Sequence, residues 1–382
     1  MPEEIPSFEV SDAIVEAGGG DLLRCFQCGT CTSVCPWKIT SSMRTRMMIH
    51  LQQLGLEGYE ESELWRCVTC RNCVQNCPRG VGIIDVVSSA RSIMVELGSL
   101  PRSLQSALSS LRANGNPWQG DNSVRSNLSE KIGIPVFSEG FDYIFFPCCT
   151  SIYDREGEKS LKAISFLLNK SGIRAGLLPS GGVCCGDVAK RSGAMDIVTE
   201  LHEKLLTEFD SLNWARPIFV SPHCFVMMKD DFIEQGVMPL HYIQVLSRLI
   251  EEGILKVDKK INAKVTYHDP CYLGRWSGIY EEPRKILRAI AGENFVEMER
   301  NRENSICCGG GGGGAFMEVR PQERLAVMRV REGIETGAQV IATACPYCMV
   351  MLQDGILAGG LEGKIVVKDV AQILVEAVSE DL

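Results

Sequence analysis

Cysteine is the residue that gives this chain most of its chemical capacity. The 382 residues contain 18 cysteines, of which eight lie in the first 80 residues and ten are distributed over the rest. The N-terminal sequence MPEEIPSFEV shows no basic region followed by an apolar core, so we expect no secretory signal and a reducing compartment. Thiols at this density, in a protein that is not exported, are typical of metal binding rather than of disulfides.

The first eight cysteines form two runs with the spacing C-x2-C-x2-C-x3-C-P, at residues 25–36 and 67–78. In two-cluster ferredoxins of this spacing, three cysteines of a run bind one [4Fe-4S] cluster and the fourth binds the other. We therefore expect one cluster on Cys25, Cys28, Cys31 and Cys77, and a second on Cys35, Cys67, Cys70 and Cys73. Two zinc sites would explain the CxxC pairs, but not the third cysteine or the repeated Cys-Pro ending.

The other ten cysteines indicate an internal duplication. The interval from Cys149 to Cys271 is 122 positions, and two further intervals, 184 to 307 and 224 to 345, are 123 and 121 positions. Apolar runs ending in cysteine (141–148, 216–224, 263–271 and 338–348) alternate with amphipathic helical patterns such as PRKILRAIAG. Such alternation predicts parallel sheets covered by helices, with the cysteines beyond the carboxyl ends of the strands.

We therefore predict a multi-domain protein: a helical ferredoxin-type domain followed by two duplicated α/β domains. The expected boundaries are 1–97 for the ferredoxin-type domain, 98–140 for a Gly/Pro/Ser-containing linker with one helix, 141–258 for the first copy and 259–382 for the second. Between the two ferredoxin runs, Met43, Met47, Met48, Leu51 and Leu54 recur at helical spacing, which predicts a helix with its methionines in the core.

The second copy carries the sharpest motif, Cys271-x35-Cys307-Cys308-Gly309-x35-Cys345-x2-Cys348. Six glycines, 309–314, would allow the backbone to approach a cluster closely. The competing interpretation is a phosphate-binding loop, but no Gly-Lys-Ser/Thr follows. His268, just before the motif, could donate a proton to a leaving thiolate or simply hydrogen-bond the loop.

These residues, with their flanking sequences HDPCYLGR, NRENSICCGGGGG and ATACPYC, resemble the CCG domain found in the B-type and D-type subunits of heterodisulfide reductases. The helical front resembles the C-type subunit of the same enzymes, and the joined arrangement is that of the D-type subunit. The resemblance implies a non-cubane iron–sulfur cluster at which a disulfide is cleaved or formed. Its expected ligands are Cys271, Cys307, Cys308, Cys345 and Cys348.

The first copy is degenerate, because Met227 stands where the second copy has its last cysteine. A neighbouring pair, Cys148 and Cys149, restores the number of thiols to five at a different geometry. We expect a zinc ion, a further cluster or nothing at a site formed by Cys149, Cys184, Cys185 and Cys224. His223 is an alternative nitrogen ligand or a structural residue.

Two functions compete. The first is a heterodisulfide reductase-like oxidoreductase subunit that passes electrons through two [4Fe-4S] clusters to the non-cubane cluster, where a small thiol or disulfide substrate reacts. The second is a non-catalytic electron-transfer subunit of a flavoprotein dehydrogenase or CoA-ester reductase complex. A zinc scaffold without redox chemistry is a third interpretation. Because Gly18-Gly19-Gly20 does not follow a strand, we expect the flavin or haem to come from a flavoprotein, cytochrome or hydrogenase-type partner.

Composition excludes other classes. With 45% hydrophobic and 23% charged residues the chain is typical of a globular protein, and its formal charge of −9 argues against nucleic-acid binding. No apolar run approaches the ~18 residues of a membrane span. We therefore predict an oxygen-sensitive cytoplasmic protein of anaerobic metabolism, or one held at the membrane by a partner.

Overall fold

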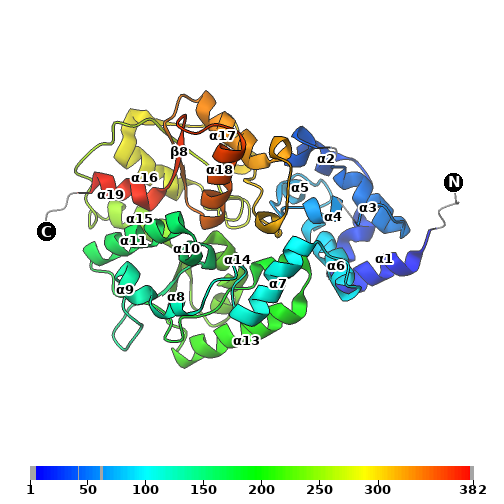
Figure 1. Ribbon diagram of the computed structural model, residues 1–382, viewed down its shortest axis with the longest axis horizontal. Coiled ribbons are helices and arrows are strands. Elements are labelled where there is room, and N and C mark those ends of the chain that lie inside the picture. The colour runs from blue at the N-terminus through cyan, green and yellow to red at the C-terminus, as the bar shows by residue number, and fades with distance from the viewer. Residues whose placement is uncertain (1–5, 42, 61–62, 379–382) are drawn as a thin grey trace.

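A helical N-terminal part leads into two α/β halves in the computed structural model, which describes residues 6–41, 43–60 and 63–378 (Figure 1). The helical part lies at one end of the molecule, beside the glycine-rich region of the second half. Its elements are α1 (Phe8–Ile14), η1 (Val15–Gly19), η2 (Gly20–Arg24), α2 (Thr30–Val34), η3 (Pro36–Ile39), α3 (Thr45–Leu54), α4 (Glu63–Arg66), α5 (Asn72–Gln75) and α6 (Ile83–Glu96).

The predicted methionine-containing helix is α3, and it is shorter than the segment between the two cysteine runs. It ends at Gly55, whose φ of +61° is the left-handed conformation common at helix C-termini. Met48 is fully buried within α3, and Met43 is buried just before it. Both therefore serve the core, as the periodicity indicates, whereas Met47 is only half-buried.

The first α/β half contains a four-stranded parallel sheet with the strand order β2-β1-β3-β4. Three helices precede it: α7 (Arg102–Asn114), α8 (Ser123–Ser126) and α9 (Leu128–Ile132). The half itself consists of β1 (Tyr143–Phe146), α10 (Cys149–Tyr153), α11 (Arg155–Lys170), β2 (Ala175–Gly176), α12 (Asp187–Ser192), α13 (Met195–Ser211), β3 (Pro217–Phe219), α14 (Pro222–Glu234), β4 (Leu240–His241) and α15 (Tyr242–Glu251).

The second half repeats this topology with the parallel order β6-β5-β7-β8. It consists of β5 (Val265–Tyr267), α16 (Glu281–Ala291), β6 (Phe295–Val296), α17 (Leu325–Glu335), β7 (Val340–Thr343), α18 (Pro346–Ala358), β8 (Val366–Asp369) and α19 (Val370–Ala377), with short 3₁₀ turns η4 (Gly292–Asn294), η5 (Arg302–Asn304), η6 (Gly314–Phe316) and η7 (Pro321–Glu323). Two parallel sheets of equivalent order confirm the predicted fold class.

The ends of the strands differ from the apolar runs in a way that matters for the cysteines. The run 216–224 forms strand only to Phe219, because Ser221 caps α14 by accepting a hydrogen bond from the His223 N–H and Pro222 occupies the first helical position. Cys224 therefore lies in the first turn of a helix. In the second half Cys345 is the N-cap of α18, and Cys348 lies in its first turn.

The two halves share a hydrophobic core in which α11 packs on α19 and α15 packs on α16. Within this core the Tyr242 hydroxyl donates to the Asp369 carboxylate, with both carboxylate oxygens 2.9 Å away. Among the described residues, we find no helix that combines the length and the apolar character needed to cross a membrane.

Candidate metal centres

The two ferredoxin-type runs adopt the same unusual backbone. In each run the residues before and after the second cysteine have positive φ: Gln27 (65°) and Gly29 (86°) in the first, Thr69 (48°) and Arg71 (67°) in the second. A positive φ at a β-branched threonine is strained, and such strain persists where the surroundings enforce it, often at functional sites. Both runs are thus wound as tight loops around their cysteines.

The fourth cysteine of the first run lies with the first three of the second. Cys35, Cys67, Cys70 and Cys73 line one small, almost entirely apolar cavity. Burial and then the neighbouring Cys70 raise the pKa of Cys35 to about 12. Four converging thiols in an enclosed space match the ligand set of a [4Fe-4S] cluster.

The first three cysteines of the other run form a second, more exposed group. Burial, and then the charges of Cys25 and Cys28, raise the pKa of Cys31. Cys28 is exposed, whereas Cys25 and Cys77 are partly buried and pack against the same core as Cys31. The Cys77 thiol accepts a hydrogen bond of 3.4 Å from the Val81 N–H.

The five cysteines of the second copy converge from three loops on one buried site. The Sγ atoms of Cys271 and Cys307 are 3.8 Å apart, and the Cys348 thiol donates to Cys308 at 3.3 Å. Hydrogen bonds from Cys307 and then Cys348 hold the pKa of Cys308 well below its usual range. Burial opposes ionisation at Cys345, but hydrogen bonds with Cys348 and His223 lower its pKa to about 6. Contacts with Cys271 and Cys308 raise the pKa of Cys307, and burial raises that of Cys348, both well above the usual value, so the acidity is concentrated on Cys308 and Cys345. Converging sulfurs from three loops suit an iron–sulfur cluster.

The five-cysteine site of the second copy lies next to the N-terminal ferredoxin-type domain. The thiols of Cys70 and Cys307 are close enough to interact, and this interaction lowers the pKa of Cys70 to about 6. The cysteine group of the second ferredoxin run and the five-cysteine site therefore adjoin each other. Centres bound by these two ligand sets would lie close enough together for direct electron transfer.

The glycine run 309–314 lies against the backbone of the second ferredoxin run. A Cβ atom at Gly311 would stand 2.5 Å from the Val68 carbonyl oxygen, and one at Gly312 would stand 2.3 Å from the Cys67 carbonyl oxygen. The sequence suggested that these glycines let the backbone approach a cluster. Here they let the second cysteine run approach the five-cysteine site.

The first copy also gathers five buried cysteines. Hydrogen bonds with Cys184 and then Cys224 lower the pKa of Cys185 to about 7, and further contacts join Cys148 to Cys224 and Cys149 to Cys184. The set brought together is Cys148, Cys149, Cys184, Cys185 and Cys224. Cys148 therefore stands inside the group, whereas the sequence placed it only as a substitute of different geometry.

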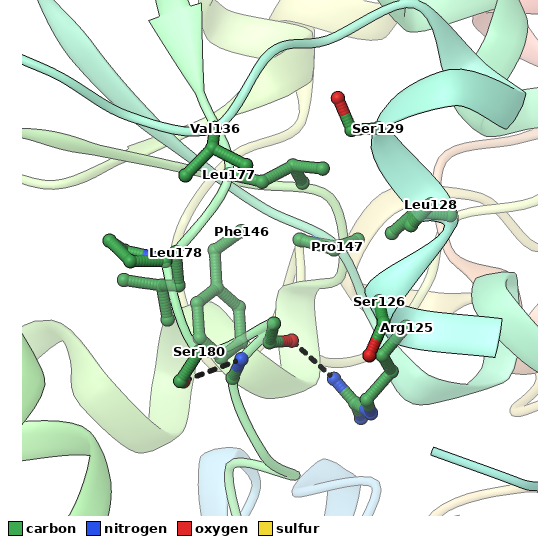
Figure 2. A pocket seen from close by; sticks show the side chains of 13 residues that line it. Arg125, Ser126, Leu128, Ser129, Val136, Phe146, Pro147, Leu177, Leu178 and Ser180 are labelled. Carbon is green, nitrogen blue, oxygen red and sulfur yellow. Dashed lines mark hydrogen bonds between the residues drawn. The ribbon is translucent and has the colours of Figure 1, made fainter. Parts of the chain in front are cut away.

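Arg125 is a residue of the first site that carries no sequence signal. Its guanidinium is 7% exposed, donates to the Cys149 Sγ at 3.0 Å and to the Gly181 carbonyl at 3.1 Å. Figure 2 shows it at the edge of a cavity of about 140 Å³ beside Phe146 and Pro147. A fixed cation at a thiol favours the thiolate, which is the metal-binding form.

His223 connects the two halves. Its Nδ1 is 2.7 Å from the Asp187 carboxylate, its ring stacks on Tyr272 at 3.7 Å, and it interacts with Cys345 of the other copy. Although burial opposes charging, Asp187 and Cys345 raise the pKa of His223 well above its usual range. The residue thus faces the five-cysteine site of the second copy, which the sequence could not indicate.

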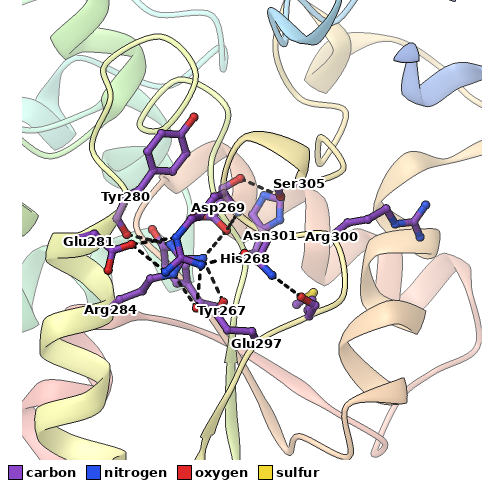
Figure 3. A network of polar contacts seen from close by, with 12 residues as sticks. Tyr267, His268, Asp269, Tyr280, Glu281, Arg284, Glu297, Arg300, Asn301 and Ser305 are labelled. Carbon is purple, nitrogen blue, oxygen red and sulfur yellow. Dashed lines mark hydrogen bonds and ion pairs between the residues drawn. The ribbon is translucent and has the colours of Figure 1, made fainter. Parts of the chain in front are cut away.

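Asp269, which lies next to His268 just before the five-cysteine motif, forms a buried ion pair with Arg284. Its carboxylate accepts from both Nη atoms of the buried Arg284 at 2.7 and 2.9 Å, and from the Arg302 N–H at 2.8 Å (Figure 3). Arg284 also binds Glu297. This network fixes the strand end on which the site is built.

Comparison with known proteins agrees with this arrangement. Residues 143–229 and 265–353 match the family described as a cysteine-rich domain, CCG, and residues 21–81 match a 4Fe-4S dicluster domain. A fold match, at a TM-score of 0.53 and 12% identity, covers 89% of this chain and 68% of a hypothetical protein from Helicobacter pylori. Together these domains define the class of iron–sulfur oxidoreductases that join a dicluster domain to CCG domains.

Within this class, the chain is similar to the D-type heterodisulfide reductase subunits. It is 29% identical to the D-type subunit of the Methanosarcina barkeri dihydromethanophenazine:CoB–CoM heterodisulfide reductase, over 94% of both chains. It is also 29% identical to the probable iron-sulfur-binding oxidoreductase FadF of Bacillus subtilis and 31% identical to the EtfAB:quinone oxidoreductase of Syntrophomonas wolfei. These alignments cover 94% and 85% of this chain, which spans 60% and 48% of the two relatives. The predicted resemblance to heterodisulfide reductase subunits and the predicted iron–sulfur cofactors are thereby confirmed.

Proposed function

We propose that this chain reduces a small disulfide at the five-cysteine site of the second copy, using electrons that arrive through the dicluster domain. The reaction breaks one S–S bond, consumes two electrons and two protons, and releases two thiols; the reverse reaction forms the disulfide. The proposed ligands are the two ferredoxin groups inferred from the sequence and the set Cys271, Cys307, Cys308, Cys345 and Cys348. When bound, the clusters supply one-electron transfer and an iron centre with affinity for sulfur.

A cavity beside Cys308 is the observation that favours disulfide chemistry over simple electron transfer. Its volume is about 480 Å³, within the range of small-molecule sites. Trp37, Trp65 and Met351 contribute apolar wall, and Cys308 itself is a lining residue. An electron-transfer protein needs no room for a small molecule at its last cysteine site, whereas a disulfide reductase does.

The charges of this cavity indicate the substrate class. Arg66 and Arg320 both pair with Glu323, and Arg324 pairs with Asp354. Because one carboxylate serves two guanidinium groups, each with five donors, an anionic group on a ligand finds hydrogen-bond donors that no described residue engages. The cavity therefore suits a disulfide with apolar arms and at least one carboxylate, sulfonate or phosphate.

Electron transfer without substrate chemistry is the second candidate function. It is favoured by the interaction between Cys70 and Cys307 and by relatives whose names are those of a quinone oxidoreductase and a ferredoxin. Under both functions a flavoprotein, cytochrome or hydrogenase-type partner would supply or accept the electrons, either in the cytoplasm or at a membrane. We propose such a partner from the chemistry, since one-electron clusters need a donor and an acceptor.

The test fills the cavity without changing a cysteine. Protein purified without oxygen is mixed with electrochemically reduced methyl viologen and 3,3′-dithiodipropionate, an anionic aliphatic disulfide, and free thiol is measured. Ala315→Trp places an indole in the cavity, and Leu357→Trp places the same group on the exposed face of α18, where Leu357 is 65% exposed.

We expect thiol release by the wild type and by Leu357→Trp, and a loss of at least tenfold in Ala315→Trp at unchanged iron content. Oxidation of viologen by an artificial one-electron acceptor should be the same in all three. If the wild type passes electrons to that acceptor but releases no thiol from this disulfide or from uncharged and cationic analogues, the electron-transfer function replaces the one proposed.

A further inference from the structure

His268 stands at the five-cysteine site in a setting that fixes which of its ring nitrogens carries a proton. It follows β5 (Figure 3) and is fully buried. Its backbone N–H donates to the Ala342 carbonyl at 2.9 Å. The ring has two kinds of neighbour: the guanidinium of Arg329 and the thiols of Cys308 and Cys348. The guanidinium needs a hydrogen-bond acceptor on the ring, whereas the sulfurs can accept a hydrogen bond from it.

Arg329 determines the state of Nδ1. Its Nε–H donates to the His268 Nδ1 at 3.0 Å, and a guanidinium can only donate, so Nδ1 must carry no proton. Arg329 is itself held in place, because it donates to the Arg300 carbonyl at 2.7 Å and to Glu332 at 2.8 Å. A ring turned over would set a C–H group against this N–H. The neutral imidazole therefore carries its proton on Nε2.

The Nε2–H group points into the cysteine site. Within the described part of the chain, Nε2 has no hydrogen-bond partner that meets ordinary geometry, although it is buried. A ring nitrogen of His268 and the Sγ atoms of Cys308 and Cys348 lie within 4.8 Å of one another. Of the two thiols, Cys308 is the one that affects the pKa of the His268 ring. A buried N–H requires an acceptor, and sulfur is the acceptor that this site provides.

We propose that His268 is a positioning residue that donates an N–H hydrogen bond to sulfur at the five-cysteine site, and is neither a metal ligand nor the proton donor of the reaction. Ligation would need Nε2 without its proton. Acid catalysis would need a second proton on Nδ1, where Arg329 stands. This differs from the proton-donating role that the sequence allowed, and it holds whether or not the substrate is a disulfide.

The first copy lacks this device. The residue 122 positions before His268 is Phe146, which ends β1 and is buried. There the donor to sulfur is Arg125, which comes from a different segment of the chain and contacts Cys149. The two cysteine sites therefore receive their hydrogen bonds from different side chains, so we expect different redox properties. Hydrogen bonds to the sulfurs are one of the factors that set the reduction potentials of iron–sulfur centres.

Two amide substitutions separate the two sides of the ring. His268→Gln places an amide near Nε2 and can keep a donor toward sulfur. His268→Asn places an amide near Nδ1, so it keeps an acceptor for Arg329 but not the N–H toward sulfur. His202→Asn is the matched control, because His202 pairs with Asp231 away from both cysteine sites.

The readout is the reduction potential of the five-cysteine centre, followed by EPR in anaerobic titrations; a signal absent from Cys345→Ser identifies the centre. We expect a lower potential in His268→Asn, because the reduced and more negative state loses a donor. The potential should be near the wild-type value in His268→Gln and in the control. Equal shifts in both His268 variants, or no shift in either, would overturn the proposal.

The wild-type protein gives a second readout that does not depend on how the variants fold. ENDOR spectra in H₂O and D₂O should show an exchangeable proton coupled to the centre, and ¹⁵N-histidine labelling should show only weak nitrogen coupling. Because His223 also lies beside Cys345, the same spectra of His223→Asn assign the coupling that remains to His268. A strong coupling from a directly bonded nitrogen that is retained in His223→Asn would make His268 a ligand and would contradict the inference, while leaving the proposed disulfide chemistry open.

Discussion

The guanidinium of Arg275 donates a hydrogen bond of 2.6 Å to the carbonyl oxygen of Cys70, across 205 positions of sequence. The same side chain, 5% exposed, donates to the carbonyls of Ser305 at 2.8 Å and Glu303 at 3.0 Å. Arg275 thus ties the second ferredoxin run to the loop that leads into Cys307. Since Cys70 and Cys307 are close enough to interact, this arginine fixes the junction between the two cysteine sites.

We predict that Arg275→Met destabilises the junction. The buried carbonyl groups of Cys70 and Ser305 and the partly buried one of Glu303 would lose a charged donor, which costs about 3 kcal/mol of the free energy of unfolding. Reduced viologen donates electrons to the dicluster domain, and the five-cysteine centre should receive these electrons at least tenfold more slowly in the variant. Anaerobic thermal unfolding and rapid-mixing spectroscopy measure the two effects.

Arg174→Met is the control for this substitution, because Arg174 makes a bidentate but exposed pair with Asp142. Its free energy of unfolding should change by less than about 0.5 kcal/mol. An Arg275→Met protein with wild-type reduction kinetics would show that Arg275 does not hold the junction.

The glycine run makes a second prediction about the same junction. Gly312 has a φ of +62°, and a Cβ there would stand 2.3 Å from the Cys67 carbonyl oxygen, where Arg91 also donates at 2.8 Å. Gly312→Ala should therefore cost both backbone strain and a steric clash, about 3 kcal/mol or more.

Gly360→Ala isolates the strain. Gly360 has a φ of +60° with no other atom within 4 Å of the position of a Cβ. We expect it to lower the free energy of unfolding by only about 1 kcal/mol and to leave the transfer of electrons between the sites unchanged. Equal losses in the two variants, measured by anaerobic thermal unfolding, would mean that close packing at Gly312 is unimportant.

The parts of the site that could be predicted are those in which ligands are close in sequence. The spacing of the ferredoxin runs, and the near-constant interval of about 122 residues between the copies, are direct consequences of local geometry and of duplication. The sheets follow from the same alternation, and the structure shows both with equivalent strand order. Such patterns can be recognised in the sequence because each one depends on a short stretch of chain.

The side chains that join the parts could not be predicted, because their partners are distant backbone groups. Arg91 is fully buried and donates to the carbonyls of Leu64, Cys67, Arg191 and Gly312, which belong to three parts of the molecule. An arginine in an amphipathic helix normally indicates a solvated face. Nothing near Arg91 in sequence distinguishes it, and the same is true of Arg125 and Arg329.

Asp369 gives a prediction about pH. Burial raises the pKa of this carboxyl to about 7, against the hydrogen bonds from Ala371 and Tyr242. Between about pH 4 and 7 the folded protein holds a proton that the unfolded chain has lost, so stability falls as the pH rises through this interval and levels off above it. The pKa difference corresponds to roughly 4 kcal/mol at most.

Asp369→Asn removes this titration and retains a side chain suited to the N-cap of α19. We expect the apparent melting temperature of the variant to equal that of the wild type near pH 4 and to exceed it at pH 8. Asp142→Asn, at an exposed position, should leave the pH profile unchanged in this interval. Parallel profiles for Asp369→Asn and the wild type would contradict the assignment.

The first copy gives the last prediction, since five buried thiols and a cationic donor meet there. Two four-iron clusters in the dicluster domain and one at the five-cysteine site would account for about twelve irons per chain. We expect anaerobic protein to contain further iron or zinc, which both Cys148→Ser and Cys184→Ser remove. Met227→Leu should retain it, because Met227 occupies the position of Cys348 without being needed as a ligand. Metal analysis that shows equal content in Cys148→Ser and the wild type would restrict the site to the other four cysteines or exclude it.

Brief exposure to air should lower the iron content, because Cys28 is exposed in the dicluster domain.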